Sequence, residues 1–435
     1  MGTPTPTLAY LSTFLLFTLF RITSRARRSL TSSHGDEWPS LLGQDGRFPL
    51  DTHYSLHYNM NILKNFQYRI FPTKKQLRML ESTLEECRWL YNHLLEARKT
   101  AYEQEGRSLS CYGQQATYPI LKEQRPSLSI VHSQVLQNVA VRVDLAMKAF
   151  FRRVKAGETP GYPRFKGYGR YDSFCYPQSG FSITHDTRVS LSKIGAVKMV
   201  YHRPVRGSIK TAAVHRSSTN KWYVTFSCEC EPQRLEPTST QVGIDVGLKT
   251  FATLSNADEI DNPRFFRQEE KALAQAQRRL CKAEKGTPER KKRRNVVARV
   301  HERATFKREN FTHQQSRQIV DRFGVICVED LHVNRMVHNH CLAKSISDAA
   351  WSAFFSHLSC KAEEAGRQFI KVSPAYTSQD CSRCHHRQKM PLGERMYQCP
   401  CCLLSIDRDH NAALNIKALG LHSVGLPLEA PAFYA

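Results

Sequence analysis

The chain has 435 residues, enough for two or three domains with separate hydrophobic cores. Its 63 Lys and Arg outnumber 39 Asp and Glu, and the formal net charge of +24 indicates a polyanionic partner such as a phosphate backbone, although a merely sticky basic protein would share it. The 14 cysteines are mostly isolated, which excludes a small disulfide scaffold and is typical of buried thiols in a reducing compartment.

Residues 1–59 differ in character from the rest of the chain. LAYLSTFLLFTLF (8–20) is an apolar run of 13 residues, short for a membrane span, and its arginines follow it, the reverse of a secretory signal. A weak membrane anchor, a targeting segment and upstream sequence added by a wrongly assigned start codon all remain open. We favour the last, with residues 1–59 as a non-conserved leader, because Met60 immediately precedes a well-formed strand and helix pattern.

Residues 60–160 predict a strand followed by helices. NILKNFQYRIF is a strand pattern that ends at Pro72, and Thr73 with Gln76 three residues later forms a capping box. The next helix has one apolar face, made of Leu77, Leu80, Leu84, Cys87, Tyr91 and Leu94. A second amphipathic helix is expected over 133–154. We assign 60–110 to a strand and helix-turn-helix-like region and 111–160 to a helical lobe.

Residues 161–232 predict a β-rich region that begins with a loop rich in Gly, Pro, Tyr and basic residues. Aromatic faces next to cations can stack bases and hold phosphates, so the candidate nucleic-acid contacts are Tyr162, Arg164, Lys166 and Arg170. An ordinary Gly/Pro loop is an equal alternative. IKTAAVHRS and KWYVTFSCECE flank the turn-forming STN, which predicts a hairpin, and 232–240 is a linker pattern.

The C-terminal half alternates strands and helices. VGIDVGLKTFATLS (242–255) predicts two strands with a tight turn at Gly247, and FGVICVEDL and QFIKVS predict two more. A long helical region over 269–320, broken near 286–288, carries a basic run in which Arg293 and Arg294 are candidate nucleic-acid contacts. One amphipathic helix is expected over 345–366, stopped by Gly366.

Four cysteines near the C-terminus have the spacing of a zinc ribbon, Cys381-x2-Cys384-x14-Cys399-x2-Cys402. The scattered free thiols argue against a disulfide pair, and the doubled CxxC spacing argues against chance. Four sulfurs complete a tetrahedral sphere, so we expect the zinc to be structural. Cys401 could replace Cys402 as the fourth ligand.

Three separated acids form a second constellation: Asp245 within an apolar strand, Glu329 at the end of another, and Asp409 at the start of the last helix. Charge in apolar strands is costly unless a divalent cation compensates it, and carboxylates suit Mg²⁺. Together they could hold two ions about 4 Å apart for phosphodiester cleavage. Taken singly, Asp245 could be a turn residue, Glu329 could pair with an arginine, and Asp409 could be a simple N-cap. We expect Asp330 to cap locally and Asp407 to be an outer partner.

Several blocks resemble, in order, those of the OrfB/TnpB proteins of bacterial insertion sequences, compact relatives of type V CRISPR effectors that are often named transposases. The blocks are GIDVGLKTFATLS, VICVEDL, TSQDCSRC and QCPCCLLSIDRDHNAALNI. FQYRIFPTKKQLRMLESTLEECRWLYNHLLEAR resembles the family's opening helix-turn-helix block, and GYPRFKGYGRYDSFCYPQ with the hairpin resembles its wedge region. The resemblance covers 60–421, and residues 1–59 have no counterpart.

This resemblance implies an α+β multidomain fold: a RuvC-like (RNase H-type) nuclease core with an inserted zinc ribbon, plus an N-terminal β-rich wedge domain carrying a helical lobe. The core would span 241–376, the ribbon 377–406, the last helix 407–421, and a tail 422–435. In this family the ribbon precedes the last helix, so folding the knuckle would position the segment that carries Asp409. The family commonly has glycine after the second cysteine of each knuckle, where this chain has His385 and Leu403.

The resemblance also implies an RNA-guided DNA endonuclease, with Asp245, Glu329 and Asp409 as catalytic Mg²⁺ ligands, a guide RNA and a target DNA as partners, and a cytoplasmic or nucleoid location. Three alternatives remain. A nuclease-inactive, guide-directed DNA-binding protein would be expected to lack one of the acids. A transposase that joins strands itself should show an HxH-plus-Tyr arrangement, and none stands out. A membrane-anchored basic protein would depend on residues 8–20.

Overall fold

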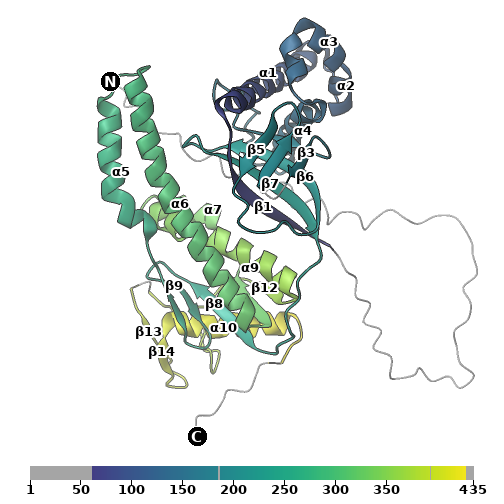
Figure 1. The fold of residues 1–435 in the computed structure, drawn as a ribbon. Coiled ribbons are helices and arrows are strands. Elements are labelled where there is room, and N and C mark those ends of the chain that lie inside the picture. Colours follow the sequence, from purple (N-terminus) through teal and green to yellow (C-terminus); the bar gives the residue numbers. More distant parts are fainter. Residues whose placement is uncertain (1–60, 185–186, 392, 428–435) are drawn as a thin grey trace, which may run out of the picture. The chain divides into compact units, whose positions relative to one another are not determined.

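The computed structural model describes residues 61–184, 187–391 and 393–427 (Figure 1). The leader expected over 1–59, its apolar run 8–20, the start at Met60 and the tail beyond residue 427 lie outside these described residues. Within them, no helix combines the length and the apolar character that crossing a membrane requires. The described structure contains two larger sheets and one two-stranded sheet.

The first sheet has seven strands in the order β2-β6-β7-β1-β5-β4-β3, and all of its pairs are antiparallel. Its strands are β1 (Ile62–Phe71), β2 (Ser173–Tyr176), β3 (Phe181–Thr184), β4 (Arg188–Leu191), β5 (Gly195–Met199), β6 (Ser208–Arg216) and β7 (Trp222–Cys230). The predicted β6–β7 hairpin is confirmed. The predicted first strand is also confirmed, and it pairs with β7 in the middle of this sheet although about 150 residues separate them.

A group of helices lies between β1 and β2 in the chain: α1 (Lys74–Glu105), α2 (Cys111–Ala116), α3 (Tyr118–Gln124), a 3₁₀ turn (Pro126–Ile130) and α4 (Ser133–Lys155). The capping box is confirmed, because the Thr73 side chain accepts from the Gln76 N–H and the Gln76 side chain accepts from the Thr73 N–H. The apolar face of α1 is buried as expected, except that Leu77 is half-buried. This face shares one hydrophobic core with α4 and the seven-stranded sheet.

The second sheet has five strands in the order β10-β9-β8-β11-β12. They are β8 (Gln241–Val246), β9 (Thr250–Leu254), β10 (Glu259–Asp261), β11 (Val325–Glu329) and β12 (Gln368–Val372). The central strand β11 runs parallel to both β8 and β12. The strand–turn–strand prediction for 242–255 and the two later strand predictions are confirmed.

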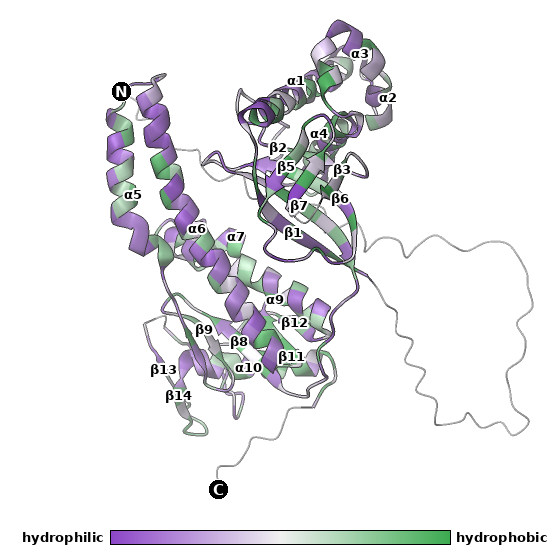
Figure 2. Ribbon diagram, viewed as in Figure 1, coloured by the Kyte–Doolittle hydropathy of each residue, from purple (hydrophilic) through white to green (hydrophobic). Residues whose placement is uncertain are grey.

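Helices cover both faces of this second sheet (Figure 1). They are α6 (Pro288–Arg322), α7 (Val333–Met336), α8 (Ala343–Ala349), α9 (Trp351–Ala365) and α10 (Arg408–Ser423), while α5 (Phe265–Lys282) forms a hairpin with the N-terminal part of α6 that projects away from the sheet. Along β11, Ile326 and Val328 pack with α6 and α9, whereas Val325 and Cys327 pack with α10. A strand buried on both faces is apolar over most of its length, as Val325–Val328 are here, and Figure 2 shows such hydrophobic stretches next to a largely hydrophilic α6.

The single helix expected over 345–366 is wrong, because the chain breaks at Ala350 into α8 and α9. Ala350 has a left-handed backbone, with φ at 58°. Ile346 and Trp351 are both buried, yet in one continuous helix they would point about 140° apart. The break therefore rotates the buried face of α9 relative to that of α8, so that both side chains can be buried. The stop at Gly366 is confirmed, with φ at 72°.

Two glycines let α10 lie directly against the sheet. A Cβ built on Gly243 of β8 would meet the Ala413 carbonyl oxygen at 2.1 Å, and one built on Gly420 of α10 would meet the Cys327 sulfur at 2.3 Å. Real Cβ contacts of this length do not occur, so a larger residue at either position would push helix and strand apart. The close approach of α10 fixes the position of its first turn relative to the end of β8.

We predict that Gly243→Ala lowers the free energy of unfolding by roughly 1–3 kcal/mol, because the added methyl group collides with the α10 backbone. Denaturant unfolding of the purified chain measures the change. Gly161→Ala is the matched control, since a Cβ there would meet nothing within 4 Å. Equal unfolding midpoints for the two variants would show that α10 does not pack this closely on β8.

Candidate active site and metal centre

Asp245 and Glu329 lie side by side at the C-terminal ends of two adjacent strands, β8 and β11, of the five-stranded sheet. The parallel register pairs Val325 with Gln241 and continues to Val328 with Ile244, so the next positions on the two strands are Glu329 and Asp245. Because side chains alternate between faces, both acids point to the side on which α10 lies, opposite the core that contains Ile244 and Val328. The strand register thus brings together two of the predicted acids.

Burial and mutual repulsion perturb these carboxyls. The pKa of Asp245 is raised well above 3.8, first by burial and then by the nearby charges of Glu329 and Asp409, with Arg408 opposing the shift. Burial also raises the pKa of Glu329, which is only 8 % exposed, and a hydrogen bond from Thr377 opposes that shift. Glu329 and Asp409 therefore both lie within electrostatic range of Asp245.

Asp409 lies in the first turn of α10, where its carboxylate forms ion pairs with Arg408 at 2.9 Å and Arg395 at 3.4 Å. The N-cap of this helix is Asp407, whose Oδ1 accepts from the backbone N–H groups of Asp409 and His410. The N-cap alternative for Asp409 is therefore wrong. The role of Asp407 as an outer partner stays a prediction.

Asp330 does not cap a helix, contrary to expectation. Its carboxylate is half exposed and accepts from the Lys371 ammonium group at 3.0 Å. The next helix, α7, begins after His332 and has no side-chain cap. Asp330 is therefore a surface ion pair next to Glu329, which makes it a useful control position.

The four predicted cysteines converge on one point. Cys381 and Cys384 follow β12, and Cys399 and Cys402 lie between the short strands β13 (Met396–Gln398) and β14 (Ser405–Asp407). Their sulfurs all lie within 4.8 Å of one another, and two pairs are 3.5 Å apart. A tetrahedral Zn²⁺ with 2.3 Å bonds sets sulfurs about 3.8 Å apart, whereas a disulfide needs about 2.05 Å. This cluster, hereafter the cysteine knuckle, has the geometry of a structural zinc site.

Cys401 is exposed and is not one of the four clustered sulfurs, so Cys402 is the fourth member of the knuckle. Of the residues that the structure describes, these cysteines form the one group of three or more donors within 4.8 Å. The three acids are not among such groups, and the carboxylate of Asp409 is ion-paired with Arg395 and Arg408.

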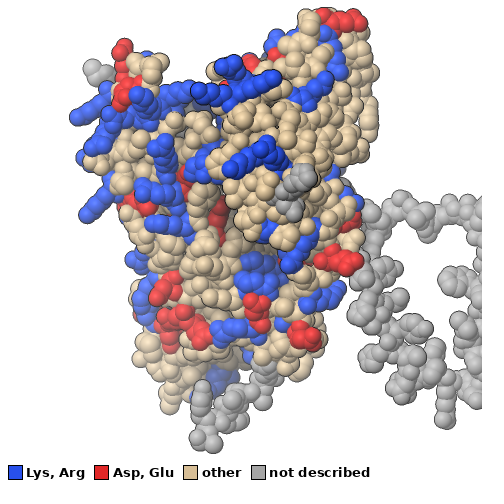
Figure 3. Space-filling view, viewed as in Figure 1, with Lys and Arg blue, Asp and Glu red and all other residues tan. Residues whose placement is uncertain are grey.

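The candidate nucleic-acid contacts lie on the surface. Tyr162, Arg164 and Arg170 are exposed in the loop before β2, whereas Lys166 is held there by its backbone, which bonds to the Asn92 side chain through both its N–H and its carbonyl. On α6, Arg294 is exposed, and Figure 3 shows Lys and Arg gathered over the α5–α6 hairpin.

Arg293 forms an ion pair with Glu289 at 2.6 Å, one turn earlier on α6. Glu289 is half exposed, and an exposed pair of this kind contributes little and exchanges readily for a stronger anion such as phosphate. The assignment of all six residues to nucleic-acid contacts stays a prediction.

Three family profiles match this chain. They are described as "Helix-turn-helix domain" (HTH_OrfB_IS605, residues 60–107), "Probable transposase" (OrfB_IS605, 225–340) and "Cas12f1-like, TNB domain" (351–416). A "Putative RNA-guided DNA endonuclease" of Streptomyces pristinaespiralis is 33% identical over 367 residues, which cover 83% of this chain and 90% of the relative. The "Putative RNA-guided DNA endonuclease InsQ" of Escherichia coli K12 is 29% identical over 385 residues, which cover 84% and 94%.

The chain belongs to the OrfB/TnpB family. Among solved structures, the chain of a "Cas12f1-sgRNA-target DNA complex" matches with a TM-score of 0.52 and 14% identity, over 82% of this chain and 99% of that one. At this identity the likeness concerns the fold alone. It supports a mixed α/β architecture of the kind found in Cas12 effectors.

The two departures from the OrfB/TnpB pattern occupy equivalent backbone positions. His385 follows the second cysteine of the first pair with φ at 59°, and Leu403 follows the second pair with φ at 57°. Both values lie in the left-handed region, where a side chain costs roughly 1–2 kcal/mol and glycine costs nothing. Leu403 is 84% exposed, so little burial offsets its strain. The family's glycines are thus explained by the turn geometry.

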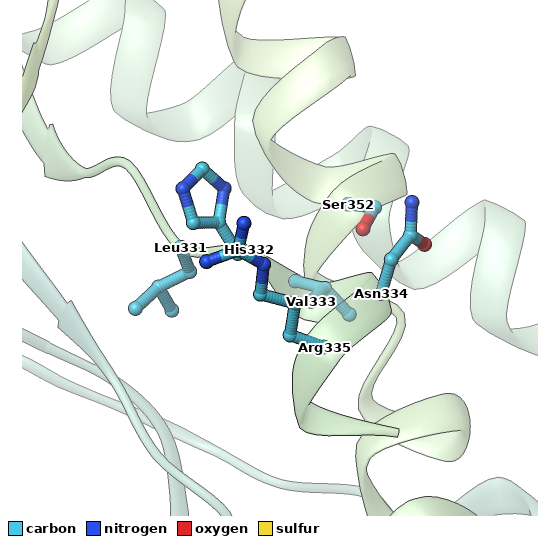
Figure 4. A pocket seen from close by; sticks show the side chains of 6 residues that line it. All are labelled: Leu331, His332, Val333, Asn334, Arg335 and Ser352. Atoms are coloured by element: carbon cyan, nitrogen blue, oxygen red, sulfur yellow. The ribbon is translucent and has the colours of Figure 1, made fainter. Parts of the chain in front are cut away.

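Sequence analysis missed three buried polar residues next to the site: Thr377, Asn411 and Asn415. A sequence signal existed for two of them, because Asn411 and Asn415 are four residues apart on one face of α10. An open pocket of about 310 Å³ was also missed. It lies directly after β11 (Figure 4) and is lined by Leu331, His332, Val333, Asn334, Arg335 and Ser352.

We predict that Cys402→Ser lowers the zinc content from one ion per chain to well below one and sharply lowers the melting temperature, because it removes one of four ligands. Cys401→Ser is the matched control and should keep the zinc content and the melting temperature of the wild type, since this thiol lies outside the cluster. Elemental analysis and thermal melts measure the effect. Equal zinc loss in both variants would contradict the assignment of the fourth ligand.

A second prediction concerns pH. The pKa of Asp245 is higher in the folded protein than in the unfolded chain. The free energy of unfolding therefore falls as pH rises from about 3.8 through this raised pKa, because ionisation of Asp245 is unfavourable in the folded state. Without added divalent ions, Asp245→Asn should therefore melt a few degrees above the wild type at pH 8, and the gap should close near pH 4.

Mg²⁺ should narrow this gap by stabilising the wild type alone, because the variant lacks the carboxylate that the cation neutralises. Asp330→Asn is the control, since Asp330 is half exposed and ion-paired, and it should open no gap that changes with pH in this way. A gap for Asp245→Asn that is the same at pH 4 and pH 8 would mean that ionisation of this carboxyl is not what costs stability.

Proposed function

We propose that this protein is an RNA-guided DNA endonuclease of a transposable element. The observation that supports the proposal most is the position of Asp245 and Glu329 at the ends of adjacent parallel strands, with Asp409 close enough to raise the pKa of Asp245. Support also comes from relatives in the OrfB/TnpB family that are named RNA-guided DNA endonucleases and that match this chain over most of their length.

In this proposal, residues 241–376 and 407–421 form a RuvC-like core of the RNase H type, and 377–406 form an inserted zinc ribbon. The order of elements supports it, because the knuckle lies between β12 and α10 and interrupts a unit of sheet and helices. The seven-stranded sheet with its helical insertion corresponds to the wedge domain and helical lobe. The finer boundaries at 60–110, 111–160 and 161–232 belong to the same proposal.

Asp245, Glu329 and Asp409 would hold the catalytic Mg²⁺ ions, since the donors are all carboxylate oxygens. When bound, Mg²⁺ supplies water activation and charge stabilisation for phosphodiester hydrolysis. The chain's own contribution is to keep two carboxylates fixed on adjacent strands and to bring the third on α10. Arg395 and Arg408 balance the charge of Asp409 through ion pairs.

A guide RNA and its target DNA are the proposed polyanions. The net charge of +24 fits the neutralisation of a long RNA and a heteroduplex, and the basic surface of α6, with Arg293 and Arg294, is the proposed backbone contact. The exposed polar side chains of His332, Asn334 and Arg335, which begin three residues after Glu329 in the chain, are further candidate contacts for a nucleic-acid strand.

We predict that Asp245→Ala, Glu329→Ala and Asp409→Ala each lower cleavage of guide-matched DNA by roughly 100-fold or more, while guide RNA binding is unchanged. Asp330→Asn should cleave like the wild type. The assay uses the protein purified with RNA from the element's own end, and a gel-based cleavage time course. Wild-type protein that binds guide and target but never cuts would favour the nuclease-inactive, DNA-binding alternative.

A further inference from the structure

Thr377 holds the buried carboxylate of Glu329. Its Oγ1 donates a hydrogen bond to Glu329 Oε1 at 2.5 Å, and the two residues are only 4 % and 8 % exposed. A buried carboxylate needs donors that lower the cost of its charge, and this bond also fixes which way the carboxylate faces. Thr377 lies four residues before Cys381, in the segment between β12 and the cysteine knuckle.

The backbone of Thr377 is itself tied to α10. Asn415 donates from Nδ2 to the carbonyl oxygen of Thr377 at 2.8 Å and to that of Asp380 at 2.7 Å. Asn411, one turn earlier on the same face, donates to the Asp380 carbonyl at 2.8 Å and accepts from the Ser382 N–H at 2.9 Å. Asn411 is fully buried and Asn415 is 6 % exposed, so water does not substitute easily for these bonds.

These contacts form one continuous path. Asp380 and Ser382 flank Cys381 of the knuckle, the two asparagines connect them to α10, and Asn415 connects α10 to Thr377, which holds Glu329. A folded knuckle fixes the backbone on both sides of Cys381, and hence the acceptors on which Asn411 and Asn415 depend. The path reaches the second acid, whereas the family resemblance implied only that the knuckle positions Asp409.

We propose that Thr377 is a positioning residue for Glu329, and that Asn415 and Asn411 make its placement depend on the folded cysteine knuckle. This inference rests on the proposed function, in which Glu329 binds a catalytic cation. The knuckle then controls two of the three acids, Asp409 through the start of α10 and Glu329 through Thr377. Substitution of a residue that orients a metal ligand through a hydrogen bond typically changes metal affinity or activity roughly 10- to 100-fold.

The first experiment compares Thr377→Val with Thr377→Ser in the full chain with its guide RNA. Valine keeps the shape and removes the hydroxyl donor, so it should lower cleavage and Mn²⁺ affinity by roughly 10- to 100-fold with zinc content unchanged. Serine restores the donor and should recover most of both. Thr83→Val is the control for the substitution itself, because Thr83 is equally buried and bonds to a helix carbonyl in α1.

Mn²⁺ affinity is measured by calorimetry on the protein–guide complex without DNA, so this readout does not depend on cleavage. Thr377→Val with wild-type cleavage and wild-type Mn²⁺ affinity would overturn the positioning role. A serine variant as impaired as valine would also overturn it, since a lost hydroxyl could not then be the cause.

The second experiment tests the path with a double-mutant cycle of Thr377→Val and Asn415→Ala, read out as Mn²⁺ affinity. If both residues act on Glu329 through one path, the double variant binds Mn²⁺ with the same affinity as whichever single variant has the lower affinity. Losses that multiply would mean that Asn415 acts independently and would overturn the coupling. If Asn415→Ala lacks zinc, Asn415→Ser takes its place in the cycle.

Asp245→Ala run in parallel separates the two levels of inference. If Asp245→Ala cleaves like the wild type, the proposed nuclease site is wrong. If Asp245→Ala is inactive and Thr377→Val is fully active, the site is right and only the positioning role fails.

Discussion

The cost of placing three carboxylates together determines how this half of the protein is built. Two sit at the ends of adjacent parallel strands, where burial and mutual repulsion raise the pKa of Asp245, and the third arrives on α10. Two of the three have a compensating partner: Thr377 donates to Glu329, and Arg395 and Arg408 form ion pairs with Asp409. For Asp245, burial and the two neighbouring acids make the ionised form unfavourable. A divalent cation that binds there would relieve this electrostatic cost.

Bringing the third acid into place depends on how closely α10 approaches the sheet. Gly243 and Gly420 remove the side chains that would separate helix from strand, and the knuckle's bonds to Asn411 and Asn415 fix the helix from its other side. The cysteine knuckle and the segment that carries Asp409 are therefore structurally linked. The short segment that must deliver Asp409 has little hydrophobic core of its own, and the cysteine knuckle supplies the missing rigidity.

Sequence reasoning predicted the parts of this structure that carry their own local pattern. The strands around Asp245 and Glu329 show uninterrupted apolar runs, and the knuckle shows a ligand spacing that few other structures require. It failed where tertiary contacts decide. The break at Ala350 exists because Ile346 and Trp351 must both be buried, and Thr377 acquires its role only when the fold brings it to Glu329. No local pattern encodes either.

The contrast between local sequence preference and tertiary constraint also applies to the two residues of the knuckle with a left-handed backbone, His385 and Leu403. The turn after each CxxC pair needs a positive φ, and here His385 and Leu403 adopt it where the family commonly has glycine. Strain of this size would be hard to sustain in a segment held by packing alone. Zinc–thiolate binding in small domains releases about 10–16 kcal/mol, far more than the roughly 2–4 kcal/mol that two such residues cost together. A zinc ion held by the four cysteines would therefore outweigh the strain of His385 and Leu403.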